Sequence, residues 1–119
     1  MKGEIEMDFS IRIETSDKKL VRDVMETNEL SANITHVKIS DDTYLTFQGS
    51  SMSKSFISSP ETVDFLLSLG ASIATGVVAN WLCAKLKDKK VTLRIDRIEV
   101  KINKDSIEKI LIERIEKDG

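Results

Sequence analysis

A long apolar segment runs from Phe65 to Leu86 and is almost free of charged side chains. Its length is close to the ~20 residues that a helix needs to span a bilayer. Just before it, Ser58 and Glu61 have capping-box spacing, and Pro60 stands where a missing N–H costs little. The lysines after it complement the partial negative charge of a helix C-terminus. We therefore expect one long helix from Glu61 to Lys87.

Three interpretations of this predicted helix are open. All-round apolar helices are usually buried, so the leading expectation is a central helix lying on the protein's own sheet. The second is a docking surface for a partner or a second copy. The third is a membrane anchor through residues 65–86, for which the following lysines would mark a cytoplasmic flank. Asn80, Ser68, Ser72 and Thr75 dilute the apolar character and make the membrane interpretation the weakest.

Small residues recur at helical spacing within the segment, on two adjacent lines. These lines are Ala71, Thr75, Ala79 and Cys83, and Ser68, Ser72, Gly76 and Asn80. A face of small residues lets another backbone approach closely, and such packing would offset the cost of ~1 kcal/mol for each mid-helix glycine. Our candidate interaction residues are therefore Ser68, Ala71, Ser72, Thr75, Gly76, Ala79, Asn80 and Trp81.

The first half of the chain predicts strands around one helix. Apolar and polar residues alternate strictly from Ile5 to Ile13, which indicates a strand with one buried face. A helix capped by Thr15-Ser16-Asp17 should follow and end around Asn28. Residues 34–39 predict a second strand, Asp41-Asp42 a turn and residues 43–47 a third, short strand. The serine-rich stretch 48–59 predicts a loop.

The C-terminal part predicts a hairpin followed by a helix. The apolar phase changes across Asp96-Arg97, and a two-residue turn there would pair Ile95 with Ile98. The same register would pair Leu93 with Val100 and Val91 with Ile102. Asp-Arg is a poor pair for a primed turn, so a bulged or longer turn is the alternative. Asp105 and Glu108 form a second capping box at the start of a short terminal helix.

The expected order is therefore β-α-β-(β)-α-β-β-α in a single domain over residues 1–119. We expect an α+β fold, a two-layer sandwich in which helices cover one face of a mainly antiparallel sheet. The long central apolar helix is the main element of the helical layer.

The composition excludes several classes of site, namely a general nucleic-acid surface, a zinc site and an internal disulfide. The 18 basic and 20 acidic side chains give a formal net charge of −2, which lacks the electrostatic footprint of a nucleic-acid binder. One histidine, His36, and one cysteine, Cys83, cannot supply a zinc site or an internal disulfide. We expect no metal, no cofactor and a cytoplasmic, reduced setting.

The search for catalytic motifs also favours a protein without catalysis. Cys83 lies in the apolar segment, where a thiolate is disfavoured, and His36 fits a surface strand. The chain has no G-x-S-x-G elbow and no glycine-rich phosphate loop after a strand. The basic cluster from Lys85 to Lys90 is interrupted by Asp88 and fits a helix end better than a phosphate site. We therefore expect a protein that is not an enzyme.

The stretch TVDFLLSLGASIATGVVANWLCAKLKDKKVTLRID, followed by IEVKINKDSIEKILIERI, resembles the effector-associated constant component family. The resemblance lies in the order of elements, with an N-E-L turn at residues 28–30, Trp81-Leu82 near the end of the apolar segment, and a V-T-L-R-I strand. It covers most of the chain. The serine-rich stretch 48–59 and the turn without glycine depart from the family pattern.

The resemblance implies an adaptor role in a prokaryotic conflict or immunity system. Members of this family are small domains encoded beside effector modules or fused to them, and they have no catalytic motif. The first functional expectation is thus a non-enzymatic domain that docks onto an effector protease, nuclease or NTPase. The alternatives are a phage or mobile-element protein that inhibits a host defence complex by binding, and a membrane-associated small protein.

Overall fold

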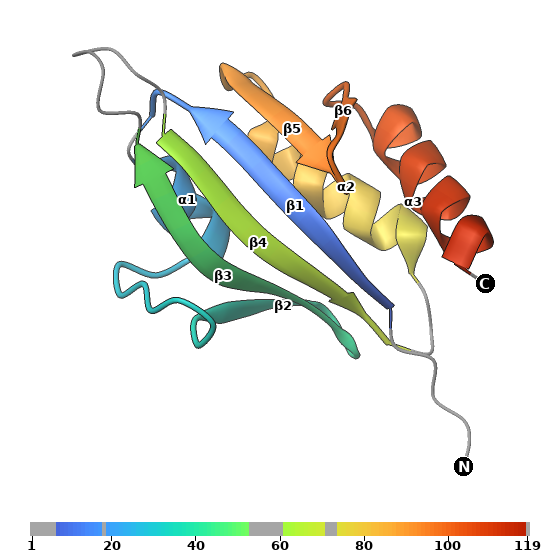
Figure 1. Ribbon diagram of the computed structural model, residues 1–119, viewed down its shortest axis with the longest axis horizontal. Helices are drawn as coiled ribbons and strands as arrows, with labels where there is room; N and C mark the ends of the chain where they lie inside the picture. The colour runs from blue at the N-terminus through green and yellow to red at the C-terminus, as the bar shows by residue number, and fades with distance from the viewer. Residues whose placement is uncertain (1–6, 18, 53–60, 71–73, 119) are drawn as a thin grey trace.

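The computed structural model describes residues 7–17, 19–52, 61–70 and 74–118 (Figure 1). The elements follow in the order β1 (Met7–Thr15), α1 (Leu20–Met25), β2 (His36–Ser40), β3 (Thr43–Met52), β4 (Glu61–Leu69), α2 (Thr75–Leu86), β5 (Val91–Ile95), β6 (Ile98–Val100) and α3 (Lys104–Asp118).

All the strands join one antiparallel, six-stranded sheet in the order β2-β3-β4-β1-β5-β6. In Figure 1 the strands face the viewer, α1 and α2 pass behind them, and α3 lies against α2 beside β6. Over the described residues, the helices leave the other face of the sheet open. The prediction of an α+β fold with an antiparallel sheet is confirmed.

The predicted continuous helix from Glu61 to Lys87 is wrong. Residues Glu61–Leu69 form the strand β4, and only Thr75–Leu86 are helical. Glu61 begins a strand, so it cannot close a helical capping box, while Ser58 and Pro60 lie outside the described residues. The predicted membrane anchor through residues 65–86 is divided in the same way, and no helix in the described ranges is long and apolar enough to cross a bilayer.

The burial pattern of β4 explains why this segment is a strand. Every second residue is almost completely buried, namely Val63, Phe65, Leu67 and Leu69. The residues between them are half-buried. This is a period of two, which belongs to a strand with two different faces. β4 also has a partner on each side, β1 and β3, along its whole length. Pairing on both edges satisfies its backbone groups as fully as a helix would.

The core lies between the sheet and the helices. The apolar residues of β1, β3, β4 and β5 that point toward the helices are buried, including Phe9, Ile11, Ile13, Leu45, Phe47, Leu93 and Ile95. The helices add Leu20, Val21, Val24, Met25, Val78, Ala79, Leu82, Leu86, Ile107 and Leu111. The rings of Phe47 on β3 and Phe65 on the neighbouring strand β4 meet edge to face, with their centroids 6.3 Å apart.

The hairpin between β2 and β3 is longer than predicted. The third strand runs to Met52 instead of ending near residue 47, so a loop beginning at Gln48 is wrong, and residues 53–59 lie outside the described residues. A bulge between Phe47 and Gly49 lets β3 continue, and Gly49 has a φ of 144°, which favours glycine. The second strand covers His36–Ser40, two residues later than predicted at its start.

The hairpin between β5 and β6 has the predicted register at its turn. Ile95 pairs with Ile98 and Leu93 with Val100, although β6 ends at Val100, so the predicted pair of Val91 with Ile102 is absent from the ladder. Asp96 and Arg97 both have positive φ, 49° and 74°. These values belong to a primed turn, which matches the twist of the two strands.

The two remaining helices differ from prediction at their ends. α1 ends at Met25, before the predicted Asn28, because Glu26 adopts a left-handed conformation that terminates the helix. α3 begins at Lys104, and the side chain of Asn103 accepts a hydrogen bond of 2.8 Å from the N–H of Ser106. Asn103, rather than Asp105, thus caps this helix.

We expect Gly70→Ala to destabilise the fold by about 2 kcal/mol, because the structure has no room for the added methyl group. A Cβ at residue 70 would lie 2.5 Å from the Cβ and Cγ of Asp42, in the turn between β2 and β3. The matched control is Gly76→Ala, whose Cβ would lie 3.3 Å from the flexible end of Glu108. Alanine is the better helix former there, so Gly76→Ala should be no less stable than the wild type in urea unfolding.

Candidate interaction surfaces

The predicted interaction residues do not form one surface. Ser68 lies on the open face of the sheet, while α2 packs against the opposite face. Ala79 is completely buried, Thr75 and Gly76 are half-buried in the first turn of α2, and Ala71 and Ser72 lie outside the described residues. Asn80 is exposed and Trp81 half-buried. The expected stripe of small residues required one continuous helix. Because residues 61–69 form β4 instead, Ser68 lies on the sheet and the described residues from Thr75 to Trp81 lie on α2.

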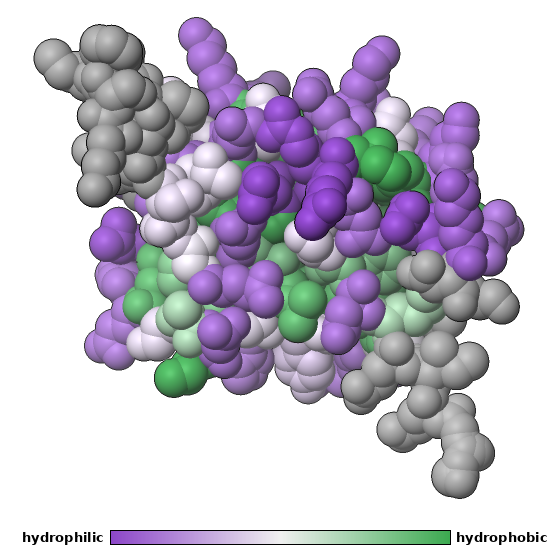
Figure 2. Space-filling view, in the orientation of Figure 1, coloured by the Kyte–Doolittle hydropathy of each residue, from purple (hydrophilic) through white to green (hydrophobic). Residues whose placement is uncertain are grey.

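The face of the sheet opposite the helices is left uncovered by the described helices. The side chains on it alternate with the core positions: Asp8, Ser10, Arg12, Glu14, His36, Lys38, Tyr44, Thr46, Thr62, Asp64, Leu66, Ser68, Thr92, Arg94 and Glu99. Figure 2 views the molecule from this side: hydrophilic side chains cover most of the face, and hydrophobic surface shows between them. We call these residues the open face.

Ion pairs link the strands across the open face. Arg12 Nε donates a hydrogen bond of 2.8 Å to Asp64 Oδ1 on β4. Arg94 pairs with Glu14 on β1 and lies 3.8 Å from Glu99 on β6. Arg12 and Arg94 are direct cross-strand neighbours, so each of these acids offsets the repulsion between two like charges.

The hydrogen bond that Arg12 donates to Asp64, followed by the negative charge of Asp64, raises the pKa of Arg12 above its ordinary value. A raised pKa keeps the guanidinium charged, so this part of the pairing is present below the unfolded-state pKa and is lost only in strongly alkaline solution. The pair is solvent-exposed, so its role is to orient side chains more than to stabilise the fold. The charged part of the open face therefore has a defined arrangement.

Apolar and aromatic groups lie beside these charges. Leu66 is half-buried between Ser10 and Thr46 in the strand register. The ring of Tyr44 meets His36 edge to face at 5.6 Å. Tyrosine and arginine are enriched where proteins bind one another, and an apolar centre with a charged rim is the usual anatomy of such a site.

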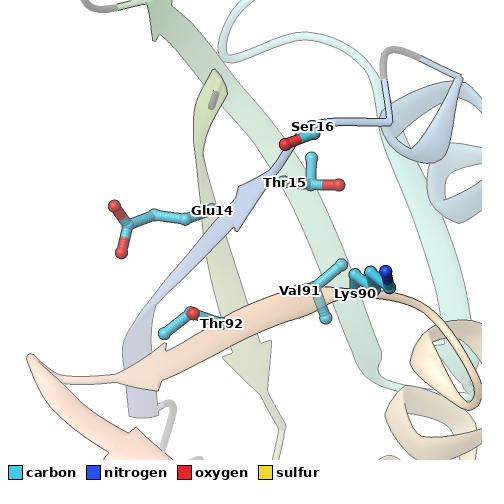
Figure 3. A pocket seen from close by; sticks show the side chains of 6 residues that line it. All are labelled: Glu14, Thr15, Ser16, Lys90, Val91 and Thr92. Atoms are coloured by element: carbon cyan, nitrogen blue, oxygen red, sulfur yellow. The ribbon is translucent and has the colours of Figure 1, made fainter. Parts of the chain in front are cut away.

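A shallow depression of about 390 Å³ lies where β1 and β5 end, lined by Glu14, Thr15, Ser16, Lys90, Val91 and Thr92 (Figure 3). Its polar groups are already engaged in part: Glu14 pairs with Arg94, and the Thr15 hydroxyl accepts a hydrogen bond of 3.0 Å from the N–H of Asp17. Figure 3 shows Glu14 pointing away from Lys90. These side chains do not converge on a common point, so the depression has no catalytic arrangement.

A second cluster joins α1 to α2 on the helical layer. Lys85 Nζ lies 5.4 Å from the ring centroid of Trp81 and 2.8 Å from Glu26 Oε2. One turn earlier on α2, Val77 is 49% exposed. The cation–π contact joins two residues of α2, and the ion pair of Lys85 with Glu26 links the end of α2 to the end of α1.

The candidate catalytic pair of Cys83 and His36 is not built as one site. His36 lies on the edge strand β2, where its Nδ1 is 3.1 Å from the carbonyl oxygen of Ile34 and its ring packs against Tyr44. Cys83 is half-buried on α2. Within the described ranges, no group of three His, Cys, Asp or Glu side chains is placed to hold a metal ion.

Sequence reasoning missed Leu66 and Tyr44 as surface residues. Leu66 falls within the expected helix from Glu61 to Lys87, and Tyr44 within the predicted third strand over residues 43–47. The signal for Leu66 is the alternation of Val63, Phe65 and Leu67 in β4, which places Leu66 on the other side.

Comparison with known proteins finds no matching family model, no matching curated protein and no matching solved structure. The resemblance to the effector-associated family therefore rests on the order of sequence elements alone.

Proposed function

We propose that this chain is a non-enzymatic protein-interaction domain that acts as an adaptor in a prokaryotic defence system by docking onto an effector. The observation that carries the interaction role is the open face, where Leu66 lies beside the ion pair of Arg12 with Asp64, and Tyr44 packs against His36. The resemblance of the sequence to the effector-associated constant component family supplies the biological setting.

The physical properties of the open face suit a protein partner. Its side chains come from a sheet whose backbone is held by pairing on both sides, so little freedom is lost on binding. The ion pairs of Arg12 and Arg94 hold charged groups in place around the apolar centre. Such an arrangement favours orientation and specificity, while the buried centre of an interface contributes most of the affinity.

Affinity capture from the native host tests this proposal with three forms of the protein. Wild type should recover a protease, nuclease or NTPase encoded near this gene. Leu66→Arg places a charge in the centre of the open face and should lower recovery about tenfold, the effect of losing one interface hot spot. Ile112→Arg is the matched control, because Ile112 is a 40% exposed apolar residue on α3, and it should recover as much as wild type.

Two results would contradict the proposal. Equal recovery by wild type and Leu66→Arg would remove the open face from the interaction. Recovery of a host defence complex by a protein whose gene lies among phage genes would replace the adaptor with an inhibitor. Circular dichroism of Leu66→Arg and Ile112→Arg checks that reduced recovery of the effector is not caused by loss of folding.

A further inference from the structure

The open face carries its charged side chains unevenly from strand to strand. Over β4, β1, β5 and β6 it has more acids than arginines, namely Asp8, Glu14, Asp64 and Glu99 against Arg12 and Arg94. Over β2 and β3, Lys38 is the one lysine, arginine, aspartate or glutamate among its described residues. Because β2 lies at one end of the sheet, the open face is positive toward that end and negative toward the other strands (Figure 1).

One row of the strand register connects the positive and the negative part. Lys38 stands opposite Tyr44, Tyr44 opposite Ser68, and Ser68 opposite Asp8, so the row crosses β2, β3, β4 and β1. Three strand spacings separate the backbones of Lys38 and Asp8 by roughly 14 Å. Both side chains are exposed, and neither has an ion pair or a side-chain hydrogen bond within the part of the chain that the structure describes. The row therefore ends in two unpaired charges of opposite sign.

The neighbouring rows need little from a partner. The next row contains His36, Thr46, Leu66 and Ser10, and has no acid, lysine or arginine. In the row after it, Arg12 is already paired with Asp64. A partner that covers Leu66 also approaches the ends of the first row, where Lys38 and Asp8 lose hydration unless the partner supplies the opposite charge.

We propose that the effector docks on the open face in one orientation, with a carboxylate opposite Lys38 and a lysine or arginine opposite Asp8. Apolar side chains of the effector then cover Tyr44 and Leu66 between these two contacts. This inference rests on the proposed function, because it names the chemistry of the partner that the open face binds. The polarity of the row excludes the reverse orientation, since turning the effector by half a turn would bring like charges together.

Binding of the purified effector that the wild type recovers tests this orientation. Lys38→Glu and Asp8→Lys should each raise Kd about tenfold at low salt, because each brings like charges into contact. The double variant Lys38→Glu/Asp8→Lys has the net charge of the wild type but the opposite polarity, so it should bind more weakly than either single variant. At about 1 M salt the Debye length falls to about 3 Å, and these differences should shrink.

Two charge reversals on α3 are the matched controls. Lys109→Glu and Glu113→Lys make the same changes of net charge at exposed positions outside the open face. Both variants should bind the effector as tightly as the wild type. Circular dichroism of every variant checks that weaker binding is not caused by loss of folding.

Binding of the double variant as tight as that of the wild type would overturn the inference. Equal weakening by Lys38→Glu and Lys109→Glu would also overturn it, because net charge alone would then explain the effect. In either case the proposed function stands if Leu66→Arg has lost the effector. Recovery of no effector by the wild type, or undiminished binding by Leu66→Arg, overturns both proposals.

Discussion

Leu67→Arg should unfold the protein, whereas Leu66→Arg, one residue earlier, should leave it folded. Leu67 is completely buried beneath the helices in the middle of β4, and Leu66 is half-buried on the open face. An unpaired arginine at position 67 would lose its hydration, which costs more than about 4 kcal/mol. At position 66 its aliphatic part can lie along the sheet with the guanidinium in water, so the loss should stay within about 1 kcal/mol.

Urea unfolding followed by circular dichroism measures the difference between these two variants. The two substitutions are chemically identical, so helix or strand propensity does not distinguish them. Equal destabilisation of the two proteins would contradict the alternation of β4. The folded Leu66→Arg protein is also the variant that tests binding at the open face.

Asp96→Ala should destabilise the protein by about 2 kcal/mol, through two lost hydrogen bonds and a strained backbone. Asp96 Oδ1 accepts a hydrogen bond of 2.9 Å from the N–H of Ser10, and Oδ2 accepts one of 3.1 Å from Nε of Arg114. Its own N–H donates to the carbonyl oxygen of Ser10 at 2.8 Å. Asp96 therefore connects the turn of the last hairpin to both β1 and α3.

Two control variants separate the parts of this effect. Asp96→Asn tolerates the positive φ and keeps an oxygen for Ser10, so it should lose less than about 1 kcal/mol, the value of the ion pair with Arg114. Arg97→Gly should be no less stable than wild type, because residue 97 has a φ of 74°. The account of this turn fails if Asp96→Ala unfolds at the same urea concentration as wild type.

Local patterns in the sequence predict much of the fold. The alternation in β1 is strict, and only one side of it is apolar, so the strand and its buried face are both readable. The change of apolar phase at Asp96-Arg97 predicts the turn and its register, because side chains on paired strands must share a face. The apolar positions of α3, such as Ile107 and Leu111, have helical spacing and are buried.

The segment from Glu61 to Lys87 could not be read in the same way. Phe65, Leu66, Leu67 and Leu69 are all apolar, so their spacing shows neither the period of a strand nor that of one helix face. The strand is favoured by pairing with β3, which precedes it, and with β1, which is distant in sequence, and local periodicity contains no record of those partners. In the sequence, the end of the strand β4 is marked only by Gly70 and the small residues after it, and such residues are also tolerated within helices.

The wrong prediction of a continuous helix also made the predicted interaction surface wrong. A continuous helix places Ser68, Thr75 and Ala79 on related faces, and the expected docking surface depended on that placement. With β4 in the sheet, Ser68 belongs to the open face and Ala79 to the core. The surface that we now propose is formed by residues from several strands, and its membership follows from strand register, which only the structure gives.

Nuclear magnetic resonance of the backbone tests the central claim most directly, namely that residues 61–69 form a central strand and thereby leave one face of the sheet open. Extended Cα and Cβ shifts are expected from Glu61 to Leu69, with helical shifts beginning near Thr75. Cross-strand nuclear Overhauser effects should connect β4 to β1 in the register that pairs Phe65 with Ile11. Continuous helical shifts from Glu61 to Lys87, without contacts to β1, would contradict the fold, the open face and the function proposed for it.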